Sequence, residues 1–261
     1  MIRHLQRLLK SRELLYMLVW RDVQIRYKQT VMGFLWALLM PCLIVGAGTL
    51  VRIGMASLSG KPVSAEDVAS VVVKAVPWAF FIAAVRFGTN SLISNPNLVT
   101  KIAFPKEVFP LAAVAANFLD FLIAAVAMVI ALLFMGWRPG VEALWVLPLL
   151  LVLVSFTTGL CLLLSAGNLF FRDVKYLVEV ILTYAIFFTP VLYDAPMVGK
   201  WESVLMLNPV AGILEGLAQV LVWHGQPRLG WIAYSAAVAA ITLFLGYWLF
   251  KQLEEQFAER I

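Results

Sequence analysis

Charged residues are scarce in this chain, and their scarcity excludes an ordinary soluble fold. Asp, Glu, Lys and Arg together make up 13% of the 261 residues, whereas hydrophobic residues make up 62%. A soluble domain carries about 25% charged residues and about half apolar ones. We therefore expect a membrane protein. The net charge of +5 is not gathered into a basic domain, so no nucleic-acid partner is predicted.

Residues that often carry out chemistry are also few. The chain has two histidines and two cysteines, and Cys42 and Cys161 both lie inside apolar runs, where we interpret them as packing residues. It has no G-x-x-x-x-G-K-[ST] phosphate-binding loop, no H-E-x-x-H motif and no G-x-S-x-G motif. We predict no catalytic residue, no metal site and no cofactor in this chain. An ATP-driven step would need a separate subunit.

Long apolar runs, in contrast, are abundant. A helix needs about 20 apolar residues to cross the hydrocarbon core of a bilayer. Six runs reach or approach this length, namely residues 31–51, 71–93, 108–135, 143–166, 177–191 and 229–250. The fifth is the shortest. The sequence therefore predicts an all-α membrane protein with six transmembrane helices in a single transmembrane domain, 1–261.

Basic residues predict the orientation of these spans. Six spans put both termini on one side, which holds thirteen Lys and Arg residues, while the opposite loops hold five. Because cytoplasmic segments carry the excess of basic residues, we expect both termini in the cytoplasm. We expect no cleavable signal peptide, because residues 1–30 lack a compact apolar core followed by a small-residue cleavage site.

The first thirty residues do not have the pattern of a transmembrane helix. Apolar side chains recur at helical spacing over residues 2–27, interrupted by Arg3, Arg7, Lys10 and Arg12. This pattern is typical of an amphipathic helix that lies in the membrane interface. We therefore divide the chain into an interface helix (1–30), a six-span bundle (31–250) and a cytoplasmic tail (251–261). The helix is either a simple anchor or a sliding or gating helix beside a lipid-side entrance.

The loop after the second span predicts a short cytoplasmic helix. Asn95 suits its N-cap and Pro96 its first position, and Pro105 ends it. The helix would carry three apolar side chains, Leu98, Ile102 and Phe104. Exposed apolar side chains on such a helix favour a protein partner. Packing back onto the bundle is an equal alternative.

A second short helix is predicted between the fifth and sixth spans. It begins at Asn208 and Pro209 and places Leu214 and Leu217 on one apolar stripe. Its length of about 20 Å is too short to cross a membrane. It either dips into the membrane and returns, as a gate on the exit side would, or caps the outer face of the bundle.

Three polar residues within the predicted spans are costly in hydrocarbon and are therefore candidates for function. These are Arg86, Asn117 and Asp120. Asn117 and Asp120 share a helix face, so Arg86 could pair with either if the second and third spans are neighbours. We predict a structural polar pair rather than a charge in a transport path.

A series of motifs extends along nearly the whole chain. In order, these are Arg21-Asp22, Arg26-Tyr27-Lys28, Gly33, Trp36, Pro41, Asn168, Phe171-Arg172-Asp173, the run 187–193, Leu207-Asn208-Pro209, Glu215-Gly216 and Gln219. Their order and spacing resemble the permease subunits of ABC type-2 exporters, most closely the polysaccharide and O-antigen export branch. The resemblance implies a homodimer in the bacterial inner membrane, joined to two cytoplasmic ABC ATPase subunits that bind ATP and Mg. Such an assembly exports lipid-linked polysaccharide.

The resemblance also suggests roles for individual residues. The helix that couples to the ATPase would comprise Pro96, Asn97, Leu98, Lys101, Ile102 and Phe104. The cytoplasmic entrance, beside lipid headgroups, would comprise Arg21, Asp22, Arg26, Tyr27 and Lys28. The substrate path would include Phe34, Trp36, Phe187, Phe188 and Tyr193. The exit gate would include Asn208, Pro209, Leu214 and Leu217.

Other functions stay open from the sequence. A different cargo, such as capsule polymer, teichoic acid or another amphipathic molecule, would use the same architecture. A different class is an ATP-independent lipid scramblase or a membrane-embedded enzyme. A neighbouring gene for an ATPase, beside sugar-transferase genes, would favour polysaccharide export.

Overall fold

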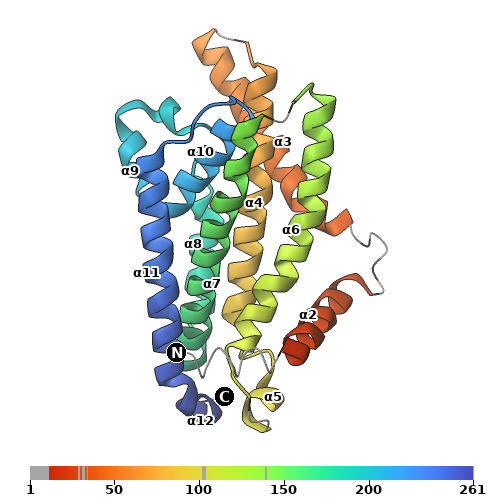
Figure 1. The fold of residues 1–261 in the computed structure, drawn as a ribbon, viewed down its shortest axis with the longest axis vertical. Coiled ribbons are helices and arrows are strands. Elements are labelled where there is room, and N and C mark those ends of the chain that lie inside the picture. Colours follow the sequence, from red (N-terminus) through yellow and green to blue (C-terminus); the bar gives the residue numbers. More distant parts are fainter. Residues whose placement is uncertain are drawn as a thin grey trace.

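The computed structural model describes residues 12–28, 30, 33, 35–60, 62–101, 104–138 and 140–260, which form an elongated helical bundle (Figure 1). Every regular element in these ranges is an α-helix or a 3-10 helix. The predicted all-α class is therefore confirmed for the described part of the chain.

Five helices in this part are long and apolar enough to cross a membrane. They are α3 (Leu35–Ser59), α4 (Ala65–Asn90), α6 (Val108–Phe134), α7 (Val146–Phe170), which continues the short helix η1 (Val141–Trp145), and α11 (Leu229–Leu253). They correspond to the first, second, third, fourth and sixth predicted spans. A chain with five such helices is a multi-pass membrane protein.

The fifth predicted span, 177–191, does not form a helix of membrane length. Helix α8 (Val174–Ala185) has 12 residues and is therefore only about 18 Å long. Turns follow it up to Tyr193. Helix α8 ends five residues before Pro190, and the turns that follow replace a continuous helix over the rest of the run.

Helix α4 lies at the centre of the bundle, against α3, α6 and α7 (Figure 1). In its most apolar stretch 78% of the residues are buried, compared with 22% in α3, α6 and α11. Its start is fixed by a capping box, in which Ser64 accepts a hydrogen bond from the Asp67 N–H and the Asp67 carboxylate accepts one from the Ser64 N–H. Most of the large hydrophobic core therefore forms around α4.

Helices α7 and α11 pack side by side with their backbones in contact. A Cβ atom at Gly159 would lie 2.6 Å from the Leu243 nitrogen, and one at Gly246 would lie 2.5 Å from the Gly159 carbonyl oxygen. Small residues allow helices to approach this closely in a membrane. Cys161 on α7 is fully buried against Gly88, which confirms its packing role, whereas Cys42 is exposed on α3.

Short elements gather at one end of the bundle, the lower end in Figure 1, which we call the α5 end. They are α2 (Arg12–Tyr27), α5 (Pro96–Lys101), η3 (Glu254–Gln256) and α12 (Phe257–Arg260). A second hydrophobic cluster joins them through Leu18, Val99 and Phe257. Leu15, Leu18 and Val19 of the predicted stripe pack against this cluster, whereas Tyr16 and Trp20 of α2 are exposed. Residues 2–11 of the predicted interface helix lie outside the described residues.

The opposite end, which we call the α9 end, carries η2 (Ala195–Trp201), α9 (Glu202–Met206) and α10 (Pro209–Leu221). Asn208 caps α10 by accepting a hydrogen bond from the Val210 N–H, and Pro209 is its first residue, as the sequence predicts. Nearly all of α10 is buried, because it packs among α4, α7 and α11.

Candidate functional site

A cavity of about 730 Å³ opens among α2, α3, α4, α6 and α8. Its walls are mostly apolar and include Trp36, Phe87 and Phe121. Its polar lining combines residues that the sequence assigns to two separate groups, the cytoplasmic entrance and the intramembrane polar pair. They are Arg26, Tyr27, Arg86, Asn117 and Asp120.

Arg26 and Tyr27, at the end of α2, bind the two polar residues of α6. Arg26 Nη1 donates to Asn117 Oδ1 at 2.9 Å and to Asp120 Oδ2 at 2.5 Å. Tyr27 donates its hydroxyl to Asp120 Oδ1 at 2.5 Å. Burial and the neighbouring Asp120 carboxylate raise the pKa of Tyr27, so its proton stays in place. The Arg26 guanidinium also lies 4.2 Å from the centre of the Phe87 ring.

The predicted pairing of Arg86 with Asn117 or Asp120 is wrong. Arg86 Nε donates to both oxygens of Glu179 on α8, at 2.8 and 2.9 Å. Asn117 and Asp120 instead bind Arg26, because α2 lies against α6. A polar pair does form at each position, but with partners from the short helices α2 and α8.

The remaining entrance residues lie outside the cavity. Arg21 forms an ion pair with Asp22 at 2.8 Å and donates to Asn95 Oδ1 at 2.8 Å. Asn95 itself donates to the Ser91 carbonyl, so its side chain links α2 to the end of α4. Lys28 is exposed. The predicted entrance is thus divided between the cavity and the neighbouring surface at the α5 end.

The predicted substrate-path residues are not brought together in one place. Trp36 lines the cavity, whereas Phe187 and Phe188 are exposed in the turn after α8. Tyr193 donates its hydroxyl to the Phe187 carbonyl at 2.8 Å and thereby holds that turn closed. Phe34 lies outside the described residues.

The short helix predicted for ATPase coupling forms as α5. Pro96 and Asn97 are exposed, whereas Leu98 and Phe104 are half-buried and pack against the second hydrophobic cluster. For these two side chains the alternative of packing onto the bundle holds. Ile102 and the side chain of Lys101 lie outside the described part of the chain.

The predicted gate residues belong to the core of the α9 end. Leu214 and Leu217 are buried on α10. Asn208 donates from its amide to the Thr189 hydroxyl at 2.8 Å, so it joins the start of α10 to the turn after α8. Pro209 follows as the first helical residue.

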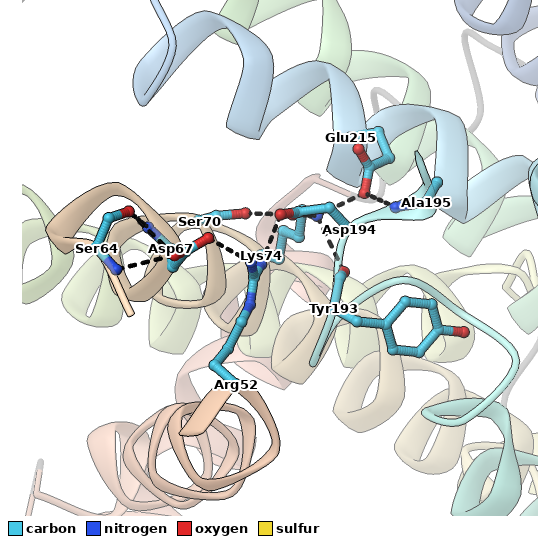
Figure 2. A network of polar contacts seen from close by, with 9 residues as sticks. All are labelled: Arg52, Ser64, Asp67, Ser70, Lys74, Tyr193, Asp194, Ala195 and Glu215. Carbon is cyan, nitrogen blue, oxygen red and sulfur yellow. Dashed lines mark hydrogen bonds and ion pairs between the residues drawn. The ribbon is translucent and has the colours of Figure 1, made fainter. Parts of the chain in front are cut away.

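A buried charge network near the α9 end was not predicted from the sequence (Figure 2). Lys74 of α4 lies 2.6 Å from Asp194 Oδ1 and 2.5 Å from Glu215 Oε1. Arg52 of α3 lies 2.8 Å from Asp67 Oδ1 and 2.8 Å from Asp194 Oδ2. The side chain of Lys74 is 0% exposed and that of Arg52 is 2% exposed. Two cations and three carboxylates thus join α3, α4, α10 and the segment after α8.

Further hydrogen bonds complete the network. Ser70 donates to Asp194 Oδ1 at 2.7 Å, and the Ala195 N–H donates to Glu215 Oε1 at 3.0 Å. Burial alone would raise the pKa of Asp194, but the charges and hydrogen bonds of Lys74, Arg52 and Ser70 outweigh it and lower the pKa. Asp194 therefore stays ionised. A signal that could have pointed to this network is Lys74 itself, a lysine inside the apolar run 71–93.

A third charged group ties α11 to the start of α6. Lys251 donates to Glu107 at 2.6 Å and to Glu254 at 2.8 Å, and Glu254 accepts from the Lys106 N–H at 2.7 Å. Glu107 is buried, and its Oε1 has no hydrogen-bond partner among the described residues. This group fixes the carboxyl end of α11 beside the loop that follows α5.

A family model described as "ABC-2 type transporter" matches residues 13–222. This range contains all of α2 except its first residue, the cavity and all members of the charge network, and it ends one residue after α10. Only α11 and the short elements after it lie beyond the match.

Curated relatives match over nearly the whole chain. A protein from Myxococcus xanthus named O-antigen export system permease protein RfbA is 28% identical over 264 residues, covering 100% of both chains. Two proteins of the same name from Klebsiella pneumoniae are 28% and 26% identical, each covering 95% of this chain and 94% of the relative.

Proposed function

Since this chain belongs to the ABC-2 type transporter family, we propose that it is the transmembrane subunit of an ATP-driven exporter of lipid-linked polysaccharide of the O-antigen type. The observation that carries the proposal is the end-to-end similarity to relatives named as O-antigen export permeases. The membrane-length helices and the partly polar cavity are what such a subunit needs.

The topology that fits this function has six crossings, with both termini in the cytoplasm of a bacterial inner membrane. The fifth crossing consists of α8 and the turns after it. Phe170 precedes α8 and contacts Phe257 at the α5 end, whereas Asp194 follows the turns and contacts Arg52 at the α9 end. The segment between them therefore passes from one end of the bundle to the other. The excess of basic residues favours the α5 end as the cytoplasmic one.

The working assembly is a homodimer with two cytoplasmic ATPase subunits, which bind ATP and Mg. Helix α5 is the contact for the ATPase in this arrangement. Its exposed surface is formed by Pro96, Asn97 and Thr100, and its buried side rests on Leu18 of α2 and Phe257 of α12 through the second cluster. A push on α5 therefore acts on packed helices rather than on a loose loop.

The cavity is the proposed entrance for the lipid-linked cargo. Its apolar walls suit a lipid chain, and Arg26 and Arg86 offer guanidinium groups to a phosphate. Helix α10, together with η2 and α9, is the proposed exit gate, which dips in from the α9 end and returns.

Deleting the gene in its native host tests the proposed function. We expect polysaccharide to disappear from the cell surface in an immunoblot of intact cells and to accumulate inside. The wild-type gene should restore the surface signal only when an intact ATPase is present, and the two proteins should copurify. Unchanged surface polysaccharide after deletion would contradict the proposal.

A further inference from the structure

A second cavity, of about 360 Å³, lies at the α9 end, away from the entrance cavity. It is formed by the segment after α8, by α9 and α10, and by residues on both sides of the loop that leads into α11. Sites for small ligands occupy about 300–1,000 Å³, so this one is at the small end of that range. Its size suits a single ring rather than an extended chain.

Three carboxylates line this cavity, and each has a cationic partner. Asp194 pairs with Lys74 and Arg52, Glu215 pairs with Lys74, and Glu202 pairs with Arg228. The charges are therefore largely balanced, and the cavity does not require a cationic ligand. Each carboxylate keeps lone pairs that can still accept hydrogen bonds from hydroxyl groups.

An amide and two indole rings complete the lining. The side chain of Gln219 forms no hydrogen bond with any described residue and can both donate and accept. Trp223 is 38% exposed, and Trp231 is half-buried, with its ring held edge-on against Tyr234 at a centroid distance of 6.1 Å. Trp223 follows α10 and Trp231 lies in the first turn of α11, on opposite sides of the loop between these helices, yet both line the same cavity.

Two indole side chains, ion-paired carboxylates and the Gln219 amide line this cavity together, and these are the groups from which a sugar site is built. The C–H face of a pyranose ring packs on an aromatic ring, while its hydroxyls need neighbouring donors and acceptors. An ammonium ligand could also pack on an indole ring by cation–π attraction, but the carboxylates that would strengthen its binding are already ion-paired, so choline is the comparison to test. A lipid chain would leave the Gln219 amide without a partner.

We propose that this cavity binds one uncharged sugar residue of the exported polymer, with Trp223 and Trp231 packing on the ring and Gln219 and Glu215 binding its hydroxyls. The inference rests on the proposed export function and adds to it a sugar site at the α9 end. Glu215 links the site to the charge network, because its Oε1 atom also accepts from Lys74. Sugar binding would thus take place directly beside the side chains that fix α10 to α4.

Saturation-transfer NMR on the full chain with its ATPase in lipid nanodiscs tests this site. The probes are methyl glycosides of glucose, galactose, mannose and N-acetylglucosamine, with choline chloride as a cationic comparison. We expect transfer to at least one glycoside and none to choline. Trp223→Ala and Gln219→Leu should each weaken glycoside binding about tenfold or more, whereas Trp223→Phe should keep most of it.

Trp201→Ala is the matched control, because Trp201 is an exposed tryptophan at the same end that does not line the cavity. It should bind glycosides as the wild type does. Choline binding in place of glycosides, the absence of transfer to any glycoside, or equal transfer in the Trp223→Ala and Gln219→Leu variants would each overturn the inference. Gel filtration of every variant checks that a loss of binding is not a loss of folding.

The binding test separates this inference from the proposed function. If Trp223→Ala and Gln219→Leu lose neither glycoside binding nor surface polysaccharide, while deletion of the gene abolishes export, the sugar site is wrong and the export function stands. If deletion leaves surface polysaccharide unchanged, the export function is wrong, and with it the assignment of the bound sugar to an exported polymer.

Discussion

Helix α4 carries two basic residues in an apolar setting, and they are held in different ways. The side chain of Lys74 is 0% exposed and lies between two carboxylates, whereas Arg86, about 18 Å further along the helix, is 39% exposed and pairs with Glu179 alone. A fully buried cation cannot lose its partners without a large cost, because no water replaces them. A half-exposed pair can open. The α9 end of α4 is therefore a fixed support, and the cavity end has charges that can change partners.

The largest effect is expected when the buried network loses its central cation. Lys74→Met leaves Asp194 and Glu215 without that partner in a buried place, at a cost of about 3–5 kcal/mol. We expect most of the variant to be lost from the membrane and the remainder to have a sharply lower melting temperature in detergent. Lys200→Met is the control, since Lys200 is exposed at the same end. Similar melting temperatures for both variants would show that the network is not a support.

An intermediate effect is expected where α2 joins α6. Asp120→Asn removes the charge that binds Arg26 and Tyr27. The side chains of Arg26 and Asp120 are each about one-fifth exposed. Hydrogen bonds to charged groups contribute about 1.5–3 kcal/mol, so we expect a loss of about 2 kcal/mol in a thermal unfolding experiment. Asp173→Asn is the control, because Asp173 is exposed. A loss as large as that of Lys74→Met would remove the distinction between the two regions.

The smallest effect on stability is expected at the half-exposed pair. Arg86→Glu should change the free energy of unfolding by about 1 kcal/mol or less. It should still reduce surface polysaccharide, because it replaces a basic residue that lines the entrance cavity with a carboxylate beside Glu179. Adding Glu179→Arg restores an opposite pair and should restore export. If the double variant exports no better than Arg86→Glu, while both fold, the pair has no role in the entrance.

Features fixed by neighbouring residues could be predicted from the sequence. Asn208 and Pro209 start α10 because a cap and a first-turn proline act within two or three residues of each other. Five of the six spans follow in the same way from their apolar length. Helix α8 is the exception, since the apolar run 177–191 does not reveal that the helix ends at Ala185 and that turns follow it.

The ion pairs could not be predicted in this way. Arg86 meets a carboxylate 93 positions away, and Lys74 meets carboxylates 120 and 141 positions away. Spacing along one helix says which residues share a face but not which helix lies opposite. Asp120 was expected to face α4, but it is bound by Arg26 because α2 lies against α6. The sequence thus identified costly charges without identifying their partners.

The close contact of α7 and α11 has a mechanical consequence. With Gly159 and Gly246 touching, neither helix can slide past the other without a steric clash, and separating them would open a void in the bundle. The two helices therefore form one tightly packed pair. This pair touches α12 at the α5 end and α10 at the α9 end. These contacts connect α12 to α10 through the helix pair, over a distance of about 37 Å, the length of α11.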